Sequence, residues 1–307
     1  MAKVGIIGGS GLYEIEGIEN VEEVSTYGEI KGLEKTGLKH VQDVTVFDTP
    51  FGPPSDHFVT GTLDGTEVVF LARHGRGHRI SPTKINYRAN IFEMKRLGVD
   101  AIISVSACGS LREEMKPMDF VVPDQFVDRT NHARESSFFD DGIVAHVSFA
   151  DPVSPEVTKV LVECCQQAGV TVHGKGTYIN MEGPQFSTKA ESNLYRSWGM
   201  DIIGMTNMAE AKLAREAEIA YASLCSVTDY DCWHGDHDQV TLEMILSNLH
   251  QNIKNAKKIL KLAIPKIGQI KKFAAADALK TAIVTDGRYI SEQKRAELKV
   301  IIGKYIK

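Results

Sequence analysis

The chain opens with the stretch Val4–Gly11, VGIIGGSG, in which an apolar run passes directly into small residues. Because its apolar residues are consecutive rather than alternating, the run predicts a β-strand that is covered on both faces. Further short runs predict strands over Val68–Ala72, Ala101–Val105, Phe120–Val122, Asp201–Ile203 and Ile219–Val227. Helices are expected over Pro82–Leu97, Pro155–Ala168, Ala190–Trp198, Ala209–Glu216 and Leu242–Ile264. Strands that alternate with helices in this way predict a single α/β layered domain.

Two segments are less regular than the rest of the chain. Residues 20–45 are charged and contain glycine, which predicts a surface insertion. After Pro265 the sequence becomes rich in lysine and alanine, and the amphipathic stretch Ile290–Ile306 predicts an appended helix. We therefore expect a principal domain over residues 1–268 and a C-terminal helical extension over residues 269–307.

The composition argues against several classes of protein. The 307 residues include 35 basic and 40 acidic side chains, and the net charge of −5 gives no basic surface for nucleic acid. No uncharged apolar run approaches the ~18 residues of a membrane span, and the N-terminus lacks the apolar core of a signal peptide. The five cysteines are too scattered for a disulfide framework or a metal site, which predicts reduced thiols in a cytoplasmic protein.

Gly8–Gly11 is the first of several motifs that place small or polar residues at the end of a predicted strand. Small residues let backbone N–H groups approach an anion, and Ser10 adds a hydroxyl donor. The motif is not a dinucleotide fingerprint, because Glu14 occupies its third glycine position, and no Gly-Lys-Ser/Thr follows as in the phosphate loop of nucleotide hydrolases. Taken alone, it fits a tight turn almost equally well.

Two further strand ends carry groups that suit an anion. Arg73 and His74 follow one of them; a guanidinium binds phosphate oxygens through two parallel hydrogen bonds, and an imidazole can add a donor. The alternative for this pair is a solvated surface position. Ser106 supplies a hydroxyl in the small-residue run Val105–Ser110, where we interpret Cys108 as a packing residue because no base accompanies it.

Asp229 and Asp231 lie two residues apart after the last predicted strand, so their side chains project the same way. A metal ion needs more ligands than this segment offers. The pair suits a ligand edge with two hydrogen-bond donors, such as a protonated ring nitrogen beside an exocyclic amine. An acidic loop in water is the alternative.

An aromatic loop and a second polar strand end complete the set. Phe186 can stack on a flat heterocycle, and Glu182, in the same loop, can bind sugar hydroxyls. Met205 and Thr206 follow another predicted strand and offer a thioether for a sugar or base and a hydroxyl for an anion. Together the motifs indicate a site for an anion that meets a purine across a ribose.

The chain resembles the 5′-methylthioadenosine phosphorylase family of trimeric purine nucleoside phosphorylases. The resemblance covers about residues 1–15 and 46–268 and rests on GIIGGSGL, LARHGRGH, NYRAN, SACGSLREE, EGPQFSTKAES, GMTNMAEAKLAREAEIAYAS and TDYDCW. It implies a single-domain nucleoside phosphorylase fold with a central mixed β-sheet flanked by helices, assembled as a homotrimer. It also implies a pentosyltransferase of purine and methionine salvage, which converts 5′-methylthioadenosine and phosphate to adenine and 5-methylthioribose 1-phosphate. Inorganic phosphate is then the co-substrate, and no cofactor or metal is implied.

The resemblance assigns roles to individual residues. Phosphate is expected to be surrounded by Ser10, Arg73, His74, Ser106, Ala107 and Thr206. The nucleoside is expected to contact Met205, Phe186, Glu182, Asp229, Tyr230 and Asp231, together with His146 from a neighbouring subunit. Ser187 and Val240 match positions that the family uses for substrate preference, whereas Ala209 departs from the usual proline.

The two carboxylates and Arg73 account for the expected catalysis. Protonated Asp229 can give its proton to N7 of the departing purine, which needs a pKa raised by desolvation beside Asp231. Asp231 accepts from a 6-amino group but would face the lone pairs of a 6-keto oxygen, and the relatives that take 6-oxopurines carry an Asn in this neighbourhood. Two alternatives remain: a phosphorylase for methylthioinosine or other 6-oxopurine nucleosides, and a non-catalytic adenine-nucleoside-binding protein.

Overall fold

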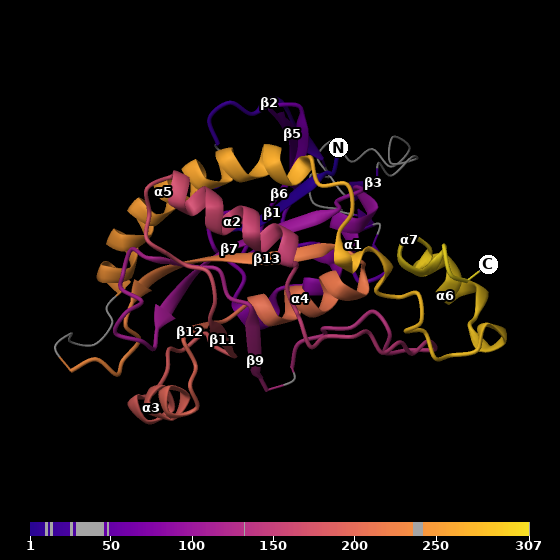
Figure 1. Ribbon diagram of the computed structural model, residues 1–307. Helices are drawn as coiled ribbons and strands as arrows, with labels where there is room; N and C mark the ends of the chain where they lie inside the picture. Colours follow the sequence, from indigo (N-terminus) through magenta and orange to yellow (C-terminus); the bar gives the residue numbers. More distant parts are fainter. Residues whose placement is uncertain are drawn as a thin grey trace, which may run out of the picture.

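The structure, a computed structural model of the chain, describes residues 1–9, 12, 15–24, 27–28, 46–47, 49–131, 133–235 and 242–306. Within these residues one large sheet organises the molecule (Figure 1). Its strands are β1 (Val4–Gly8), β2 (Glu19–Val24), β5 (Phe58–Leu63), β6 (Thr66–Ala72), β7 (Ala101–Ser110), β8 (Phe120–Val121), β9 (Gln125–Arg129), β10 (Val172–His173), β11 (Thr177–Met181), β12 (Ile202–Gly204) and β13 (Ala220–Asp229). A separate pair consists of β3 (Tyr27–Gly28) and β4 (Val46–Phe47).

The strands follow the order β10-β8-β13-β7-β1-β6-β5-β2, and β12, β11 and β9 continue from the far end of β7. The four central strands β13, β7, β1 and β6 are parallel. Strands β5 and β2 join the sheet antiparallel to their neighbours, and β12 is antiparallel to β7 but parallel to β11. The expected α/β fold with a central mixed sheet is therefore confirmed. Because parallel neighbours end on the same side, the carboxyl ends of the central strands lie together at one edge of the fold.

Helices cover both faces of the sheet, as the unbroken apolar strands predict. They are α1 (Tyr87–Arg96), α2 (Pro155–Gln167), α3 (Lys189–Ser197), α4 (Asn207–Glu216), α5 (Leu242–Gly268), α6 (Glu292–Glu297) and α7 (Lys299–Ile302). In Figure 1, α5 and α2 lie above the sheet and α4 lies below it. Successive strand residues alternate between the two cores: Ile6 and Ile103 pack on the side of α2 and α5, and Ile7 and Ile102 on the side of α1 and α4.

Two predicted helices are interrupted. The expected helix over Pro82–Leu97 begins as a short 3-10 turn, becomes extended at Ile85, and restarts as α1 after Asn86, whose side chain accepts a hydrogen bond from the N–H of Ala89 at 3.1 Å. A side chain that caps a helix start requires non-helical backbone at its own position, which explains the break. The expected helix over Ile290–Ile306 is likewise divided into α6 and α7 at Leu298.

The less regular segments of the sequence have different places in the structure. Residues 20–24 belong to the exposed edge strand β2, and most of residues 25–45 lie outside the described part, so the insertion stays a prediction. The C-terminal residues pack on α1: Leu298 and Ile301 share a core cluster with Ile91. The five cysteines are free thiols, as expected.

Candidate active site

The central strands bring the predicted residues to one end of the sheet. Arg73 follows β6 directly, and its backbone N–H donates to the carbonyl of Gly8 at the end of β1, 2.9 Å away. Ser106 lies on β7 and Asp229 ends β13, where it pairs with Gly109 of β7. A Cβ at Gly109 would lie 3.0 Å from Oδ1 of Asp229, so the glycine leaves room for the carboxylate.

Arg73 is 3% exposed, and protein groups hold its guanidinium. Nε and Nη2 both donate to the carboxylate of Glu210, Nη2 also donates to Oγ of Ser104 at 2.6 Å, and Nη1 donates to the carbonyl of Val105 at 3.1 Å. Burial opposes the charge of Arg73, but the carboxylate of Glu210 outweighs it and raises the pKa of Arg73. The edge of the guanidinium formed by Nε and Nη2, which was expected to bind phosphate through two hydrogen bonds, therefore binds Glu210. Only the remaining nitrogen of Arg73, Nη1, is available to bind phosphate.

Asn207 joins the two hydroxyls that are expected to face phosphate. Its Oδ1 accepts from Oγ of Ser106 at 2.9 Å and from Oγ1 of Thr206 at 3.2 Å. Asn207 is fully buried at the start of α4, so the helix fixes where both hydroxyls lie. Ala107, the neighbour of Ser106, is exposed. Asn207 and Glu210 were not predicted as site residues, although both lie in the motif GMTNMAEAK, because they fall beside or within the predicted helix Ala209–Glu216 and not directly after a strand.

His74 is held as a neutral imidazole. Its Nδ1 lies 2.8 Å from the carbonyl oxygen of Ile80, which can only accept, so Nδ1 carries the hydrogen. The ring stacks on His78 with 4.1 Å between centroids. Desolvation, followed by the charge of Arg73, lowers the pKa of His74 to about 4. Nε2 therefore carries a lone pair and accepts hydrogen bonds at neutral pH.

Arg134 binds together the segments that are expected to contact the ribose. Oε1 of Glu182 accepts from Thr83 and from Nε of Arg134, and Oε2 accepts from the backbone N–H of Asn131 at 3.0 Å. Although burial opposes ionisation, these hydrogen bonds, led by that of Thr83, hold the pKa of Glu182 below its usual range. Arg134 also donates to the carbonyl of Met205. It is a further residue that the sequence analysis missed.

Asp229 and Asp231 are both buried, each 9% exposed. Oδ1 of Asp229 accepts from the backbone N–H of Asp231 at 2.8 Å, and Oδ2 accepts from Oγ1 of Thr228 at 2.6 Å. Desolvation raises the pKa of Asp229 despite these bonds, and the charge of Asp231 adds to the effect. Desolvation also raises the pKa of Asp231, although the hydroxyls of Ser192 and Ser187 oppose the rise. Burial therefore raises the pKa of both carboxyls above the ordinary value of an aspartate.

Thr228 can serve both protonation states of Asp229. Its single hydroxyl proton lies within reach of Oδ2 of Asp229 at 2.6 Å and of the carbonyl of Cys108 at 3.2 Å. When Asp229 is ionised, the hydroxyl donates to it; when Asp229 is protonated, the hydroxyl can donate to Cys108 and accept from the carboxyl. The position therefore suits a group that gains and loses a proton during turnover.

The other predicted substrate residues are more exposed. Phe186 is 55% exposed, and the hydroxyl of Tyr230 donates to the carbonyl of Glu113 at 3.3 Å. His146 is exposed, and its backbone N–H donates to the carbonyl of Ala282 at 2.8 Å, which ties its segment to the C-terminal residues. Ser10 and Val240 lie outside the described residues, and their roles stay predictions.

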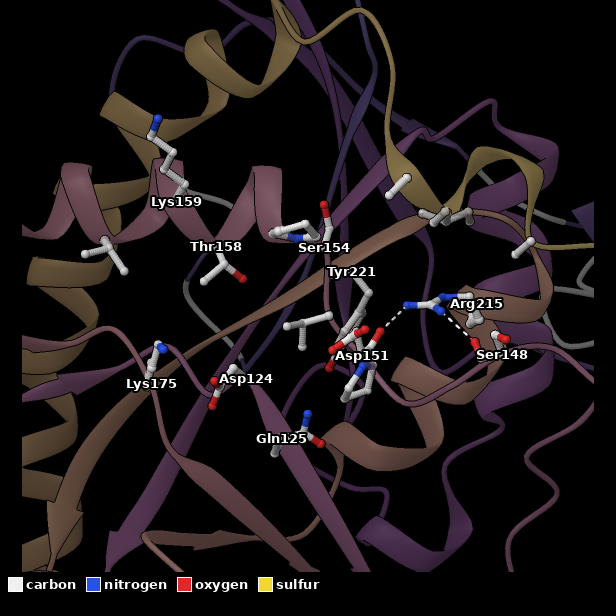
Figure 2. Close-up of a pocket in the computed structure, with 18 of the residues that line it drawn as sticks. Asp124, Gln125, Ser148, Asp151, Ser154, Thr158, Lys159, Lys175, Arg215 and Tyr221 are labelled. Atoms are coloured by element: carbon white, nitrogen blue, oxygen red, sulfur yellow. Dashed lines mark hydrogen bonds between the residues drawn. The ribbon is translucent and has the colours of Figure 1, made fainter.

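A cavity of about 730 Å³ lies at the opposite end of β13, and none of the predicted site residues lines it (Figure 2). The ring of Tyr221 and the start of α2 at Ser154 form part of its wall, and Arg215 beside it donates to the carbonyls of Ser148 and Asp151. The charged lining residues are mixed in sign: Asp124, Asp151, Glu163, Asp277, Lys159, Lys175 and Arg215. A lining of both signs selects no single class of ligand, so the strand ends remain the candidate active site.

The described residues form neither a membrane-spanning helix nor a cluster of metal ligands. None of their helices combines the length and the apolar character that crossing a bilayer requires. Nor do these residues group three His, Cys, Asp or Glu side chains as ligands for a metal ion.

Comparisons with known proteins agree with this geometry. The family model described as the phosphorylase superfamily matches residues 3–265. Curated relatives named S-methyl-5′-thioadenosine phosphorylase, from Geobacter sulfurreducens and Koribacter versatilis, are each 52% identical over 99% of this chain, with 99% and 97% of their own lengths covered. Because these matches span nearly the whole chain, the C-terminal segment has counterparts in the relatives.

Solved structures give the same result. A methylthioadenosine phosphorylase from an Antarctic soil metagenomic library superposes with a TM-score of 0.86 at 46% identity, over 98% of both chains. A methylthioadenosine phosphorylase from Schistosoma mansoni in complex with adenine has a TM-score of 0.74 at 31% identity, over 99% of this chain and 98% of that one. The chain therefore belongs to the phosphorylase superfamily, as a member of its S-methyl-5′-thioadenosine phosphorylase family.

Proposed function

We propose that the protein cleaves 5′-methylthioadenosine with inorganic phosphate and releases adenine and 5-methylthioribose 1-phosphate. The observation that carries the proposal is the pair of buried carboxyls, Asp229 and Asp231, at the same sheet end as Arg73, Ser106 and Thr206. The two carboxyls suit the edge of an adenine, and the three other residues suit an anion. The names of the closely similar relatives support the same reaction.

The chemistry follows from where charge develops. Cleavage of the glycosidic bond leaves positive charge on the sugar and negative charge on the departing base. Asp229, whose pKa burial raises, acts in its protonated form as the general acid and gives its proton to N7 of the base. Arg73 orients phosphate toward the anomeric carbon, where its charge stabilises the cation it attacks. The hydroxyls of Ser106 and Thr206 donate to phosphate when each turns its single proton from Oδ1 of Asn207 to a phosphate oxygen. We propose no cofactor or metal for this reaction.

Asp231 is proposed to select the base. Its Oδ2 is buried without a hydrogen bond of normal geometry, although the hydroxyls of Ser187 and Ser192 lie close enough to affect its pKa. An acceptor in this position binds a 6-amino group and opposes a 6-keto oxygen. We therefore place adenine nucleosides ahead of 6-oxopurine nucleosides.

The first prediction concerns the reaction itself. Free base should be released rapidly from 5′-methylthioadenosine, only when phosphate is present, and more slowly from methylthioinosine, adenosine and inosine. Base release from the four nucleosides with and without phosphate, followed by chromatography, measures this. Preference for the inosine compounds would establish the 6-oxopurine alternative. Binding of adenine nucleosides without turnover would establish a non-catalytic binding protein.

We further propose a homotrimer, in which each subunit lends His146 to its neighbour's nucleoside site. Large apolar side chains support an interface: Phe186 is 55% exposed, Leu194 of α3 is 42% exposed, and Trp198, which directly follows α3, is 48% exposed. Val144, two residues before His146, is 44% exposed. A cytoplasmic location is proposed with it, because five free thiols suit a reducing compartment.

The second prediction tests this shared site. Sedimentation equilibrium should give three times the 33.8 kDa chain mass. His146→Ala should raise KM for 5′-methylthioadenosine and leave KM for phosphate unchanged. Trimers mixed from His146→Ala and Asp229→Asn chains should regain some sites with the wild-type KM, because an intact Asp229 then meets an intact neighbouring His146. A monomer, or mixed trimers without such sites, would contradict the proposal.

A further inference from the structure

A chain of buried hydrogen bonds runs behind the candidate phosphate site. Nδ2 of Asn207 donates to Oγ of Ser223 at 2.6 Å, Oγ of Ser223 donates to the hydroxyl of Tyr221 at 3.2 Å, and that hydroxyl donates to Oε2 of Glu210 at 2.9 Å. All four side chains are at most 2% exposed. We call these four residues the relay.

Each end of the relay holds groups that are expected to contact phosphate. At one end, Oδ1 of Asn207 accepts from the hydroxyls of Ser106 and Thr206. At the other end, the carboxylate of Glu210 accepts from Nε and Nη2 of Arg73. The relay therefore connects contacts that come from β6, β7 and the start of α4.

The direction of every hydrogen bond in the relay is set by Glu210. An ionised carboxylate only accepts, so the hydroxyl of Tyr221 must donate to it. Tyr221 can then only accept from Ser223, whose own oxygen must accept from the amide nitrogen of Asn207. This orders the amide of Asn207 with its oxygen toward the phosphate side and its nitrogen toward β13.

We propose that the relay positions Arg73, Ser106 and Thr206 as one unit for phosphate. The inference rests on the proposed function, since it takes these three residues as the phosphate contacts. The relay residues themselves touch protein groups, so they are positioning residues. A break at Tyr221 should leave Glu210 with one donor fewer and Asn207 without a fixed orientation, so that Arg73 and the hydroxyl oxygens of Ser106 and Thr206 no longer keep one position. Phosphate binding should weaken, while the nucleoside contacts around Asp229 stay in place.

Tyr221→Phe is the test, because it removes the middle hydroxyl and keeps the ring. KM for phosphate should rise about fivefold, the equivalent of one net hydrogen bond, with KM for 5′-methylthioadenosine unchanged and kcat lowered less than about twofold. The matched control is Tyr305→Phe, which removes a tyrosine hydroxyl that also donates to a buried carboxylate, that of Glu218, outside the relay. The control should change neither KM.

Ser223→Ala gives a second, independent break of the relay. It should raise KM for phosphate to a similar extent, and the double variant with Tyr221→Phe should be no worse than the worse single variant, because one relay is broken only once. Independent, multiplying effects would overturn the relay, as would equal rises in both KM values. If the wild-type chain releases no adenine with phosphate, the proposed function fails and the relay with it. An active wild type whose KM for phosphate is insensitive to both variants overturns the relay alone.

Discussion

Asp229→Asn is expected to lower kcat/KM for 5′-methylthioadenosine by about 10²- to 10⁴-fold, the range that a positioned general acid contributes. The amide keeps the size of the side chain. Its oxygen can still accept from the N–H of Asp231, and its NH2 group can donate to the hydroxyl of Thr228, which can then donate to the carbonyl of Cys108, so the fold should persist. It cannot transfer a proton to the departing base. Initial rates of adenine release at saturating phosphate measure the loss, and circular dichroism checks that the variant is folded.

The pH profile tests the same assignment. Because desolvation raises the pKa of Asp229, its carboxyl keeps its proton above the usual range for an aspartate, and kcat/KM should fall as the pH rises through this raised pKa. The Asn variant should lack that part of the profile. Asp286→Asn makes the same change at an exposed residue paired with Arg288 and should alter neither rate nor profile. Wild-type activity in Asp229→Asn would show that another group protonates the base.

The parts of the site that could be predicted are those that depend only on neighbouring residues in the sequence. Strand β1 could be predicted because its apolar residues are consecutive, and Arg73 and Asp229 because they stand where such strands end. Neighbouring parallel strands then bring these ends together without further information. Strands β5 and β9 were not predicted, since they mix threonine, glycine or charged residues with apolar ones and are only partly buried. Strand β11 is buried at its centre, but its sequence TYINM places polar residues among the apolar ones.

The partners of the site residues could not be predicted from local patterns. Glu210 meets Arg73 across 137 positions, Asn207 meets Ser106 across 101, and Arg134 meets Glu182 across 48. Each partner is polar and lies on a helix or loop, where a polar residue normally faces water. Only the packing of α4 against the sheet shows that Glu210 and Asn207 are buried and committed to the strand ends.

The C-terminal residues show a related limit. The amphipathic stretch Ile290–Ile306 predicted an appended helix, whereas Leu298, Ile301 and Ile302 complete the core that contains α1. Glu218, at the turn before β13, accepts from the backbone N–H of Leu279 and from the hydroxyl of Tyr305. Short apolar segments of this kind gain order only by packing on an existing surface, so composition alone does not reveal them.

Substitutions of the buried ion pair between Arg73 and Glu210 distinguish a role in stability from a role in catalysis. Both side chains are almost fully buried, at 3% and 2% exposure. Arg73→Met should abolish phosphate-dependent adenine release. It should also leave the buried carboxylate of Glu210 without its positive partner, which lowers the free energy of unfolding by about 3–5 kcal/mol and Tm by roughly 5–8 °C in a chain of this length. Glu210→Met should destabilise the protein similarly by stranding the guanidinium.

The double variant Arg73→Met/Glu210→Met should recover most of the lost Tm, because two apolar side chains of similar length replace a buried pair. It should remain inactive, because the cation expected to bind phosphate is gone. Thermal unfolding followed by circular dichroism, with adenine release measured on the same samples, compares the three variants. Recovered activity in the double variant would mean that Arg73 serves the fold and not the phosphate. Failure to recover stability would mean that the hydroxyls of Ser104 and Tyr221, which donate to Glu210, need the carboxylate as much as Arg73 does.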